Sequence, residues 1–223
     1  MIDPERVFSD IFNDQQIIEK SVITVLLSFA VILFPFGLVA LAVLLGYQLE
    51  IIRNVRDGMT FPLPRWTNFG EKLNRGVGLM IAGAIYNLPN IFIACMASVI
   101  LSANNGIFAL GAVCCCLFPV LLLINIVTVP LQAIGTVRFA ETGRVESFFH
   151  FGSLFDTIRE NSTLLIQWWL WATLAHVVIG GIGSIIPCLG WLAMAALLVP
   201  IQGHLMGQLA GRLIDSKPKY QMM

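Results

Sequence analysis

Three observations predict that this chain is an all-α integral membrane protein. Of its 223 residues, 57% are hydrophobic and 12% are charged, whereas an ordinary soluble domain is roughly one quarter charged. Apolar windows at 21–46, 106–128 and 162–187 each exceed the roughly 20 residues that a helix needs to cross a bilayer. Charged connectors alternate with very short uncharged ones, and this alternation is typical of helical hairpins.

The uncharged connectors predict the positions of the hairpin tips. The charged connectors are residues 1–20, 50–75, 138–160 and 212–223, and the uncharged connectors are residues 35–37, 102–105 and 187–190. Six transmembrane helices follow, at 17–34, 37–55, 73–101, 106–137, 161–186 and 191–213. Residues 1–223 then form a single domain of three helix pairs, 17–55, 73–137 and 161–213, preceded by an amphipathic segment at 1–16.

The distribution of charge predicts the topology. With six helices, all 13 Lys and Arg residues lie on one face, and the positive-inside rule makes that face cytoplasmic. The expected location is therefore the cell membrane, with both termini in the cytoplasm. An alternative treats 21–46 as one tilted helix of about 39 Å, which gives five spans and an external N-terminus. The interruption at Pro35 and Gly37 favours six spans, because proline removes a helical hydrogen bond.

An amphipathic stretch precedes each predicted helix pair, with apolar residues at helical spacing. The three stretches contain Val7, Phe8, Ile11 and Phe12; Trp66, Phe69 and Leu73; and Phe148, Phe149, Phe151, Leu154, Phe155 and Ile158. We expect these segments to lie in the cytoplasmic headgroup layer with the apolar face toward the lipid. Packing of the same faces on protein is the alternative.

Three motifs along the chain resemble a known family. They are Gly46-Tyr47-Gln48-Leu49 running to Arg53, Leu63-Pro64-Arg65-Trp66 followed by Phe69-Gly70-Glu71, and Arg138-Phe139-Ala140-Glu141-Thr142-Gly143 followed by Phe151-Gly152. This set resembles the bacterial and archaeal membrane family called domain of unknown function 4013, over nearly the whole chain. The family tends to be acidic around the tryptophan, where Arg65, Thr67 and Asn68 stand here. The resemblance implies a membrane location and no established activity.

The predicted spans carry no Asp, Glu, Lys or Arg deep within them, and this disfavours two functional classes. Ion-coupled transporters usually place ionisable residues near the membrane midplane. Enzymes need acid–base or nucleophilic groups, and no such set is present. The 13 basic and 13 acidic residues cancel, which argues against a nucleic-acid partner. The five cysteines and three histidines lack the spacing of a metal site, so we expect neither a metal nor a cofactor.

Neutral polar residues provide the candidate pathway within the spans. Pro89 stands between Asn87 and Asn90, where it frees a backbone carbonyl one turn earlier. A discontinuous helix of this kind can line a polar cavity, and Asn125 and His204 are further polar residues on neighbouring helices. The competing interpretation is interhelical hydrogen bonding, which accounts for most such residues.

Two other groups of residues are candidates for lipid and helix contacts. The interfacial group is expected to bind lipid headgroups or to form surface ion pairs. It comprises Arg53, Trp66, Arg138, Glu141 and Arg144. The packing group comprises Gly203, Gly207 and Gly211, which recur every four residues and allow close approach of another helix. That helix belongs either to the same chain or to a second copy.

Two functional classes follow from these observations. The first, which we favour, is a non-catalytic membrane scaffold or subunit that works through lipids, other membrane proteins or self-association. The second is a channel or permease for a neutral or weakly charged solute. Only the Asn-Pro-Asn interruption argues for a pathway, whereas the amphipathic segments and the glycine face argue for lipid and partner contacts.

Overall fold

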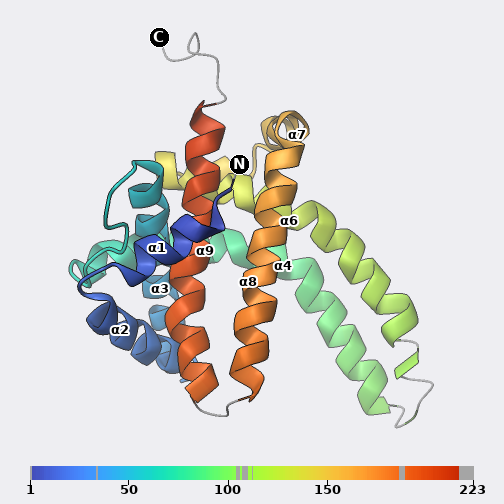
Figure 1. Ribbon diagram of the computed structural model, residues 1–223. Coiled ribbons are helices and arrows are strands. Elements are labelled where there is room, and N and C mark those ends of the chain that lie inside the picture. Colours follow the sequence, from blue (N-terminus) through green and yellow to red (C-terminus); the bar gives the residue numbers. More distant parts are fainter. Residues whose placement is uncertain are drawn as a thin grey trace.

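The computed structural model describes residues 2–33, 35–103, 106, 110–111, 113–185 and 189–215, which form helices joined by turns and contain no strand (Figure 1). The helices are α1 Pro4–Phe12, α2 Ile17–Ala30, α3 Phe36–Arg56, α4 Phe69–Ala103, the π-helix η1 Val113–Leu117, α6 Phe118–Thr142, the 3₁₀-helix η2 Val145–Phe148, α7 Phe151–Glu160, α8 Ser162–Ile185 and α9 Leu189–Asp215. Predicted tips at 102–105 and 187–190, and the C-terminal residues 216–223, lie wholly or partly outside the described residues.

Four segments are long and apolar enough to cross a membrane: Phe36–Arg56, Phe69–Ser102, Val113–Thr142 and Ser162–Gly181. The first predicted pair consists of two helices, because α2 ends at Ala30 and α3 begins at Phe36, next to Pro35. The segment 21–46 is therefore not one tilted helix. With 14 residues, α2 is only about 21 Å long, which is shorter than the hydrocarbon core of about 30 Å.

Helix α3 is the centre of the packed part of the molecule. We call this part the body; it consists of the described residues outside 88–103 and 113–129. Eleven of its residues are buried, and α4 and α9 make the most extensive contacts with it. A Cβ added at Gly46 would overlap the backbone of Lys72, and one added at Gly76 would overlap the backbone of Ala42. The backbones of α3 and α4 therefore touch at this crossing, which only glycine permits.

The predicted glycine face of α9 lies against α3 of the same chain. A Cβ at Gly207 would come within 2.5 Å of the Val55 Cβ, and one at Gly203 within 3.1 Å of the Ile51 side chain. At Gly211 the nearest backbone atom of α3 would be 3.8 Å away, which is ordinary contact. Two of the three glycines therefore set the approach of the two helices.

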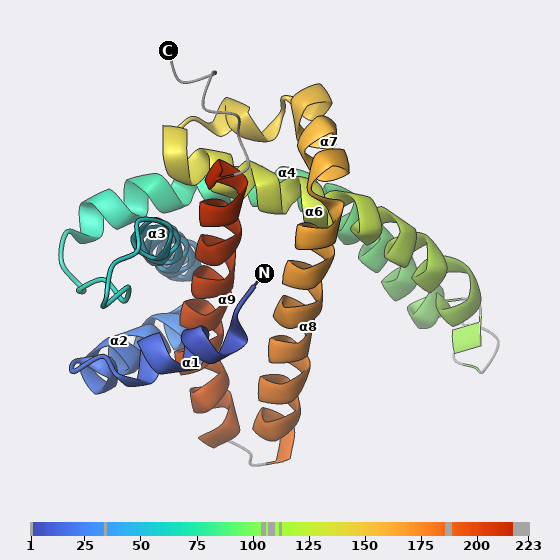
Figure 2. The same ribbon diagram turned by 45° about the horizontal axis from the view of Figure 1, so that its top comes forward.

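A hairpin of α4 and α6 extends away from this body, and we call its residues 88–103 and 113–129 the arm. In Figures 1 and 2 α4 changes direction, and beyond that point the arm diverges from α8 and α9. Pro89 lies inside α4 and Pro130 inside α6, at the base of the arm, and proline is the usual cause of a helix bend. The Asn87–Asn90 interruption is thus a bend in one continuous helix, not the predicted break.

Two of the three predicted amphipathic segments form helices of their own. In α1, Val7 and Ile11 are buried whereas Phe8 and Phe12 are exposed; in α7, Leu154 is buried whereas Phe155 is exposed. The second prediction is wrong, because residues 57–68 form a loop and Phe69 already begins α4. Contact of the exposed faces with headgroups stays a prediction.

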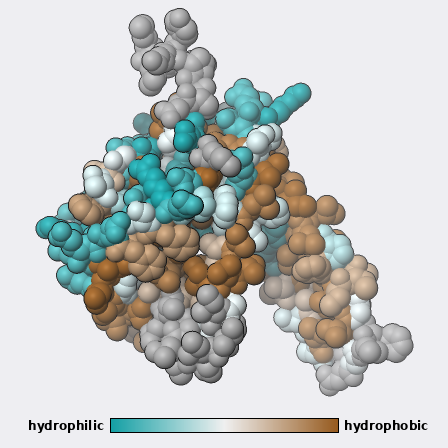
Figure 3. Space-filling view, in the orientation of Figure 1, coloured by the Kyte–Doolittle hydropathy of each residue, from teal (hydrophilic) through white to brown (hydrophobic). Residues whose placement is uncertain are grey.

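Polarity divides the molecule into two ends. Figure 3 shows hydrophilic residues gathered over the end where α7 and the last turn of α9 lie. Hydrophobic residues predominate below this end and along much of the arm. This division is what a bilayer requires of a helical membrane protein, since buried charge in hydrocarbon is costly.

Candidate functional site

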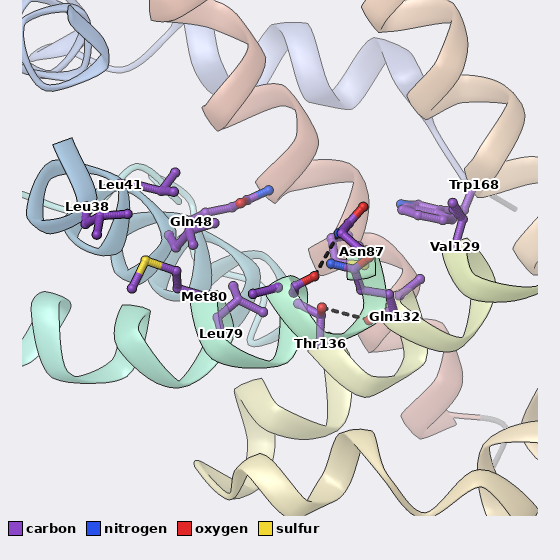
Figure 4. Close-up of a pocket in the computed structure, with 15 residues that line it drawn as sticks. Leu38, Leu41, Gln48, Leu79, Met80, Asn87, Val129, Gln132, Thr136 and Trp168 are labelled. Atoms are coloured by element: carbon purple, nitrogen blue, oxygen red, sulfur yellow. Dashed lines mark hydrogen bonds between the residues drawn. The ribbon is translucent and has the colours of Figure 1, made fainter. Parts of the chain in front are cut away.

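A cavity of about 470 Å³ lies where α3, α4, α6, α8 and α9 meet (Figure 4). Its volume is within the range of small-molecule sites in proteins. It is lined by Leu38, Leu41, Leu45, Gln48, Leu79, Met80, Gly83, Ala84, Asn87, Val129, Gln132, Ala133, Thr136, Trp168 and Met206. Leu38, Ala84 and Asn87 are exposed, so the cavity is open to the surroundings. None of its lining residues is charged.

Along α3 and α6 the wall of the cavity becomes polar toward the C-terminal end of each helix, whereas on α4 the apolar Leu79 and Met80 precede the polar Asn87. On α3 the lining residues are Leu38, Leu41, Leu45 and then Gln48, whose spacing of three and four places them on one helical face. On α6 the lining runs from Val129 to polar Gln132 and Thr136 in the same direction. Apolar and amide-bearing parts of the wall therefore face one space.

Trp168 has a hydrogen-bond donor without a partner in this wall. The residue is 6% exposed, and no described residue accepts a hydrogen bond from its indole Nε1. Figure 4 shows the ring nitrogen turned toward the side of the cavity where Asn87 lies, with the Gln48 side chain pointing toward the same region. A buried indole N–H normally finds an acceptor, so the cavity offers an unused donor.

The side-chain amides of Gln48 and Gln132 are further hydrogen-bonding groups in the cavity wall. Neither amide forms a hydrogen bond with a described residue. Both residues are half-buried. Each amide has two donors and an acceptor. Sequence reasoning placed Gln48 only within a motif and singled out neither Gln132 nor Trp168. The regular spacing of Leu38, Leu41, Leu45 and Gln48 was the available signal.

The predicted pathway residues form a hydrogen-bonded cluster at the base of the arm. Asn90 and Asn125 exchange amide hydrogen bonds of 3.2 and 3.0 Å between α4 and α6. Asn87 donates to the Gly83 carbonyl at 2.8 Å and accepts from Asn90 at 3.2 Å. Asn87 borders the cavity, but its amide already has protein partners. Pro89 shapes the helix and makes no side-chain contact of this kind.

His204 lies far from this cluster and belongs to a second polar network. Its side chain is fully buried, and Nε2 is 2.9 Å from the Asp10 carboxylate of α1. Gln208, one turn later on α9, exchanges two 2.7 Å hydrogen bonds with the backbone of Asp3. Asp10 is distant from His204 in the sequence and is brought beside it by the docking of α1.

His176 and His204 have separate partners. His176 contacts Gln202 at 2.9 Å rather than sharing a ligand with His204. Among the described residues, no group of three or more His, Cys, Asp or Glu side chains could hold a metal ion. Cys95, Cys114, Cys115 and Cys116 are free thiols with exposed side chains on the arm.

The residues predicted to face lipid headgroups mostly connect helices. Arg53 donates to the Ala140 carbonyl and thereby joins α3 to α6. Arg138 binds the Ser153 hydroxyl at 2.6 Å and the Thr157 hydroxyl at 2.8 Å, which fastens α6 to α7. Glu141 and Arg144 are exposed at the junction that follows.

Trp66 also packs on protein. Its ring stacks on Tyr47 with centroids 4.1 Å apart, and its indole donates to the Lys20 carbonyl at 3.0 Å. Two buried lysines that sequence reasoning did not pair lie nearby: Lys20 binds Asp14 at 2.7 Å and Lys72 binds Glu50 at 2.8 Å. These partners lie on different segments or across a turn, which hydropathy does not reveal.

The four described helices that are long and apolar enough to cross a bilayer are those expected of a helical membrane protein. The chain belongs to the family described as a protein of unknown function (DUF4013), which matches residues 15–188, in agreement with the resemblance of its motifs. The matched region runs from before α2 through α8, so α1 and α9, which contact each other through Asp10 and His204, lie outside it. No curated protein and no solved structure matches the chain.

Proposed function

We propose that this protein is a non-catalytic membrane scaffold or subunit that acts through contacts with lipids and with other helices. The observation that carries the proposal is the mutual hydrogen bonding of Asn87, Asn90 and Asn125. A solute pathway needs polar groups that are free to bind its cargo, whereas these amides bind one another and hold the arm together.

The arm supports the same function. Its outward side chains include Leu88, Phe92, Val99, Leu123 and Ile126, which are 57–66% exposed. Large apolar surfaces of this kind are covered by lipid or by partner helices. No ionisable side chain lines the cavity beside the arm, which favours neither catalysis nor ion coupling.

The proposal includes six spans with both termini in the cytoplasm. Short α2 then crosses the membrane with help from its contacts with α3 and α9, and the basic residues all lie on one side. Whole cells carrying Thr67→Cys or Arg144→Cys, in a background without native cysteines, should not react with an impermeant thiol reagent. Labelling of either position from outside would reverse the topology, and labelling of the N-terminus alone would favour five spans.

The functional assignment is tested at Asn87. In a background without native cysteines, Asn87→Cys should resist a small membrane-impermeant thiol reagent added from either side. Asn87→Leu should melt at a lower temperature in detergent, because about 1 kcal/mol is lost for each neutral hydrogen bond removed. Rapid labelling together with an unchanged melting temperature of Asn87→Leu would contradict the scaffold.

The second candidate function is a channel or permease for a neutral solute. The cavity favours it, because Gln48, Gln132 and Trp168 present amide and indole groups that have no partner among the described residues. Rapid labelling of Asn87→Cys together with an unchanged melting temperature of Asn87→Leu would make this function the better one.

A further inference from the structure

We propose that the cavity binds one membrane lipid, with a neutral oxygen acceptor of the lipid hydrogen-bonded to Trp168 Nε1 and one hydrocarbon chain along the α3 wall. This inference deepens the proposed function, because it names the site and chemistry of a lipid contact. It concerns the space lined by Gln48, Gln132 and Trp168, not the Asn87–Asn90–Asn125 cluster.

The polar groups of the cavity define the chemistry of the ligand. Trp168 Nε1 can only donate a hydrogen bond, so the ligand must present an acceptor. Gln48 and Gln132 bring neutral amides, and no lining residue is charged. A charged headgroup would have no counterpart inside the cavity, so the headgroup of the lipid stays outside it, at the water interface. An ester, ether or hydroxyl oxygen meets these conditions.

The apolar groups define the rest of the ligand. Leu38, Leu41 and Leu45 form a continuous stripe on α3 that leads away from Gln48, and the cavity is open beside exposed Leu38. A sugar or other hydrophilic solute would leave its polar groups unpaired against this stripe. A hydrocarbon chain would fill it.

The depth and direction of the cavity fit a lipid of the leaflet on the charged side. Trp168 is six residues after Ser162, the first residue of α8, which is about 9 Å along the helix axis. The polar wall thus lies toward the charged end of the protein, and the apolar stripe lies deeper. Glycerol-linked oxygens and hydrocarbon chains follow the same order in a bilayer leaflet.

Native mass spectrometry of the purified full chain, titrated with dioleoylphosphatidylcholine in detergent, tests the site. We expect one saturable lipid adduct. Trp168→Phe keeps the ring but removes the donor, and it should weaken this adduct about tenfold, the value of one neutral hydrogen bond. Trp169→Phe is the matched control, because Trp169 is the next residue and 44% exposed; its affinity should equal that of the natural sequence.

A second pair of variants tests the cavity independently of the donor. Ala84→Trp places a large side chain in the cavity wall and should abolish the adduct. Leu88→Trp adds the same side chain one turn later on α4, at a 58% exposed position outside the lining, and should retain it. Equal binding by both members of either pair would overturn the proposal.

Three further outcomes distinguish this inference from a quinone site and from the scaffold proposal. Ubiquinone and a second phosphatidylcholine of different mass are then compared as competitors of the dioleoylphosphatidylcholine adduct. If ubiquinone removes the adduct at the lower concentration, the occupant is a quinone and the assignment to a membrane lipid is wrong. If the adduct is absent while Asn87→Cys still resists labelling, the lipid site fails but the scaffold stands. If Asn87→Cys is labelled rapidly, Asn87→Leu melts at an unchanged temperature and the adduct persists, the scaffold fails and the lipid site stands.

Discussion

The body and the arm are built by different means although both consist of apolar helices. In the apolar window of α3, 56% of the residues are buried, compared with none in the window of α6. The body is held by backbone contact at glycines, whereas the arm is held by an exchange of two amide hydrogen bonds between Asn90 and Asn125. Hydropathy alone therefore does not reveal which membrane helices form a protein core.

The comparison predicts the largest loss of stability at the crossing of α3 and α4. Gly76→Ala should lower the free energy of unfolding by about 3 kcal/mol, because the new methyl group meets the Ala42 backbone, which cannot move aside locally. Thermal unfolding in detergent measures the change. The control is Gly70→Ala, where nothing lies within 4 Å; an equal loss at both positions would mean that backbone contact is not the cause.

A somewhat smaller loss is expected where α9 meets α3. Gly207→Leu should destabilise the protein by about 2 kcal/mol, since a branched side chain meets Val55 and the Ile52 carbonyl. The same thermal assay should find Gly211→Leu milder, because the first added atom is in ordinary contact. An unchanged melting profile of Gly207→Leu would show that α9 does not pack this way.

The docking of α1 on the body should depend on a buried polar contact. Asp10→Ala leaves His204 buried without its 2.9 Å partner, which should cost about 1–2 kcal/mol. Limited proteolysis of the N-terminal segment, followed with time, is a local measure: cleavage should be faster in Asp10→Ala. Glu5→Ala, on the same helix but without an ion pair to α9, serves as the control, and equal cleavage of the two variants would refute the role of the contact.

The smallest effect is expected in the arm. Asn90→Leu and Asn125→Leu should each reduce stability by about 1 kcal/mol, and the double variant should lose less than the sum, because the two residues share their hydrogen bonds. A double-mutant cycle of melting temperatures measures this coupling. Strict additivity would mean that the two amides act separately.

The sequence determined the helical fold and the positions of several helices. The predicted helices at 17–34, 37–55 and 161–186 correspond to α2, α3 and α8, because hydrophobic length, proline and glycine act locally along the chain. Membership of the family followed from short motifs in the same order, and the matched region confirms it. Local chemistry was sufficient for these conclusions.

The tertiary structure alone decided what the side chains of those helices do. Asp10 meets His204 across 194 positions, Asn90 meets Asn125, and Gly76 meets Ala42. The cavity takes its lining from five helices, and Trp168 is a donor without a partner because no described acceptor on the other four reaches it. Such contacts depend on how helices cross, and in an apolar solvent many crossings have similar burial, so hydropathy does not distinguish them.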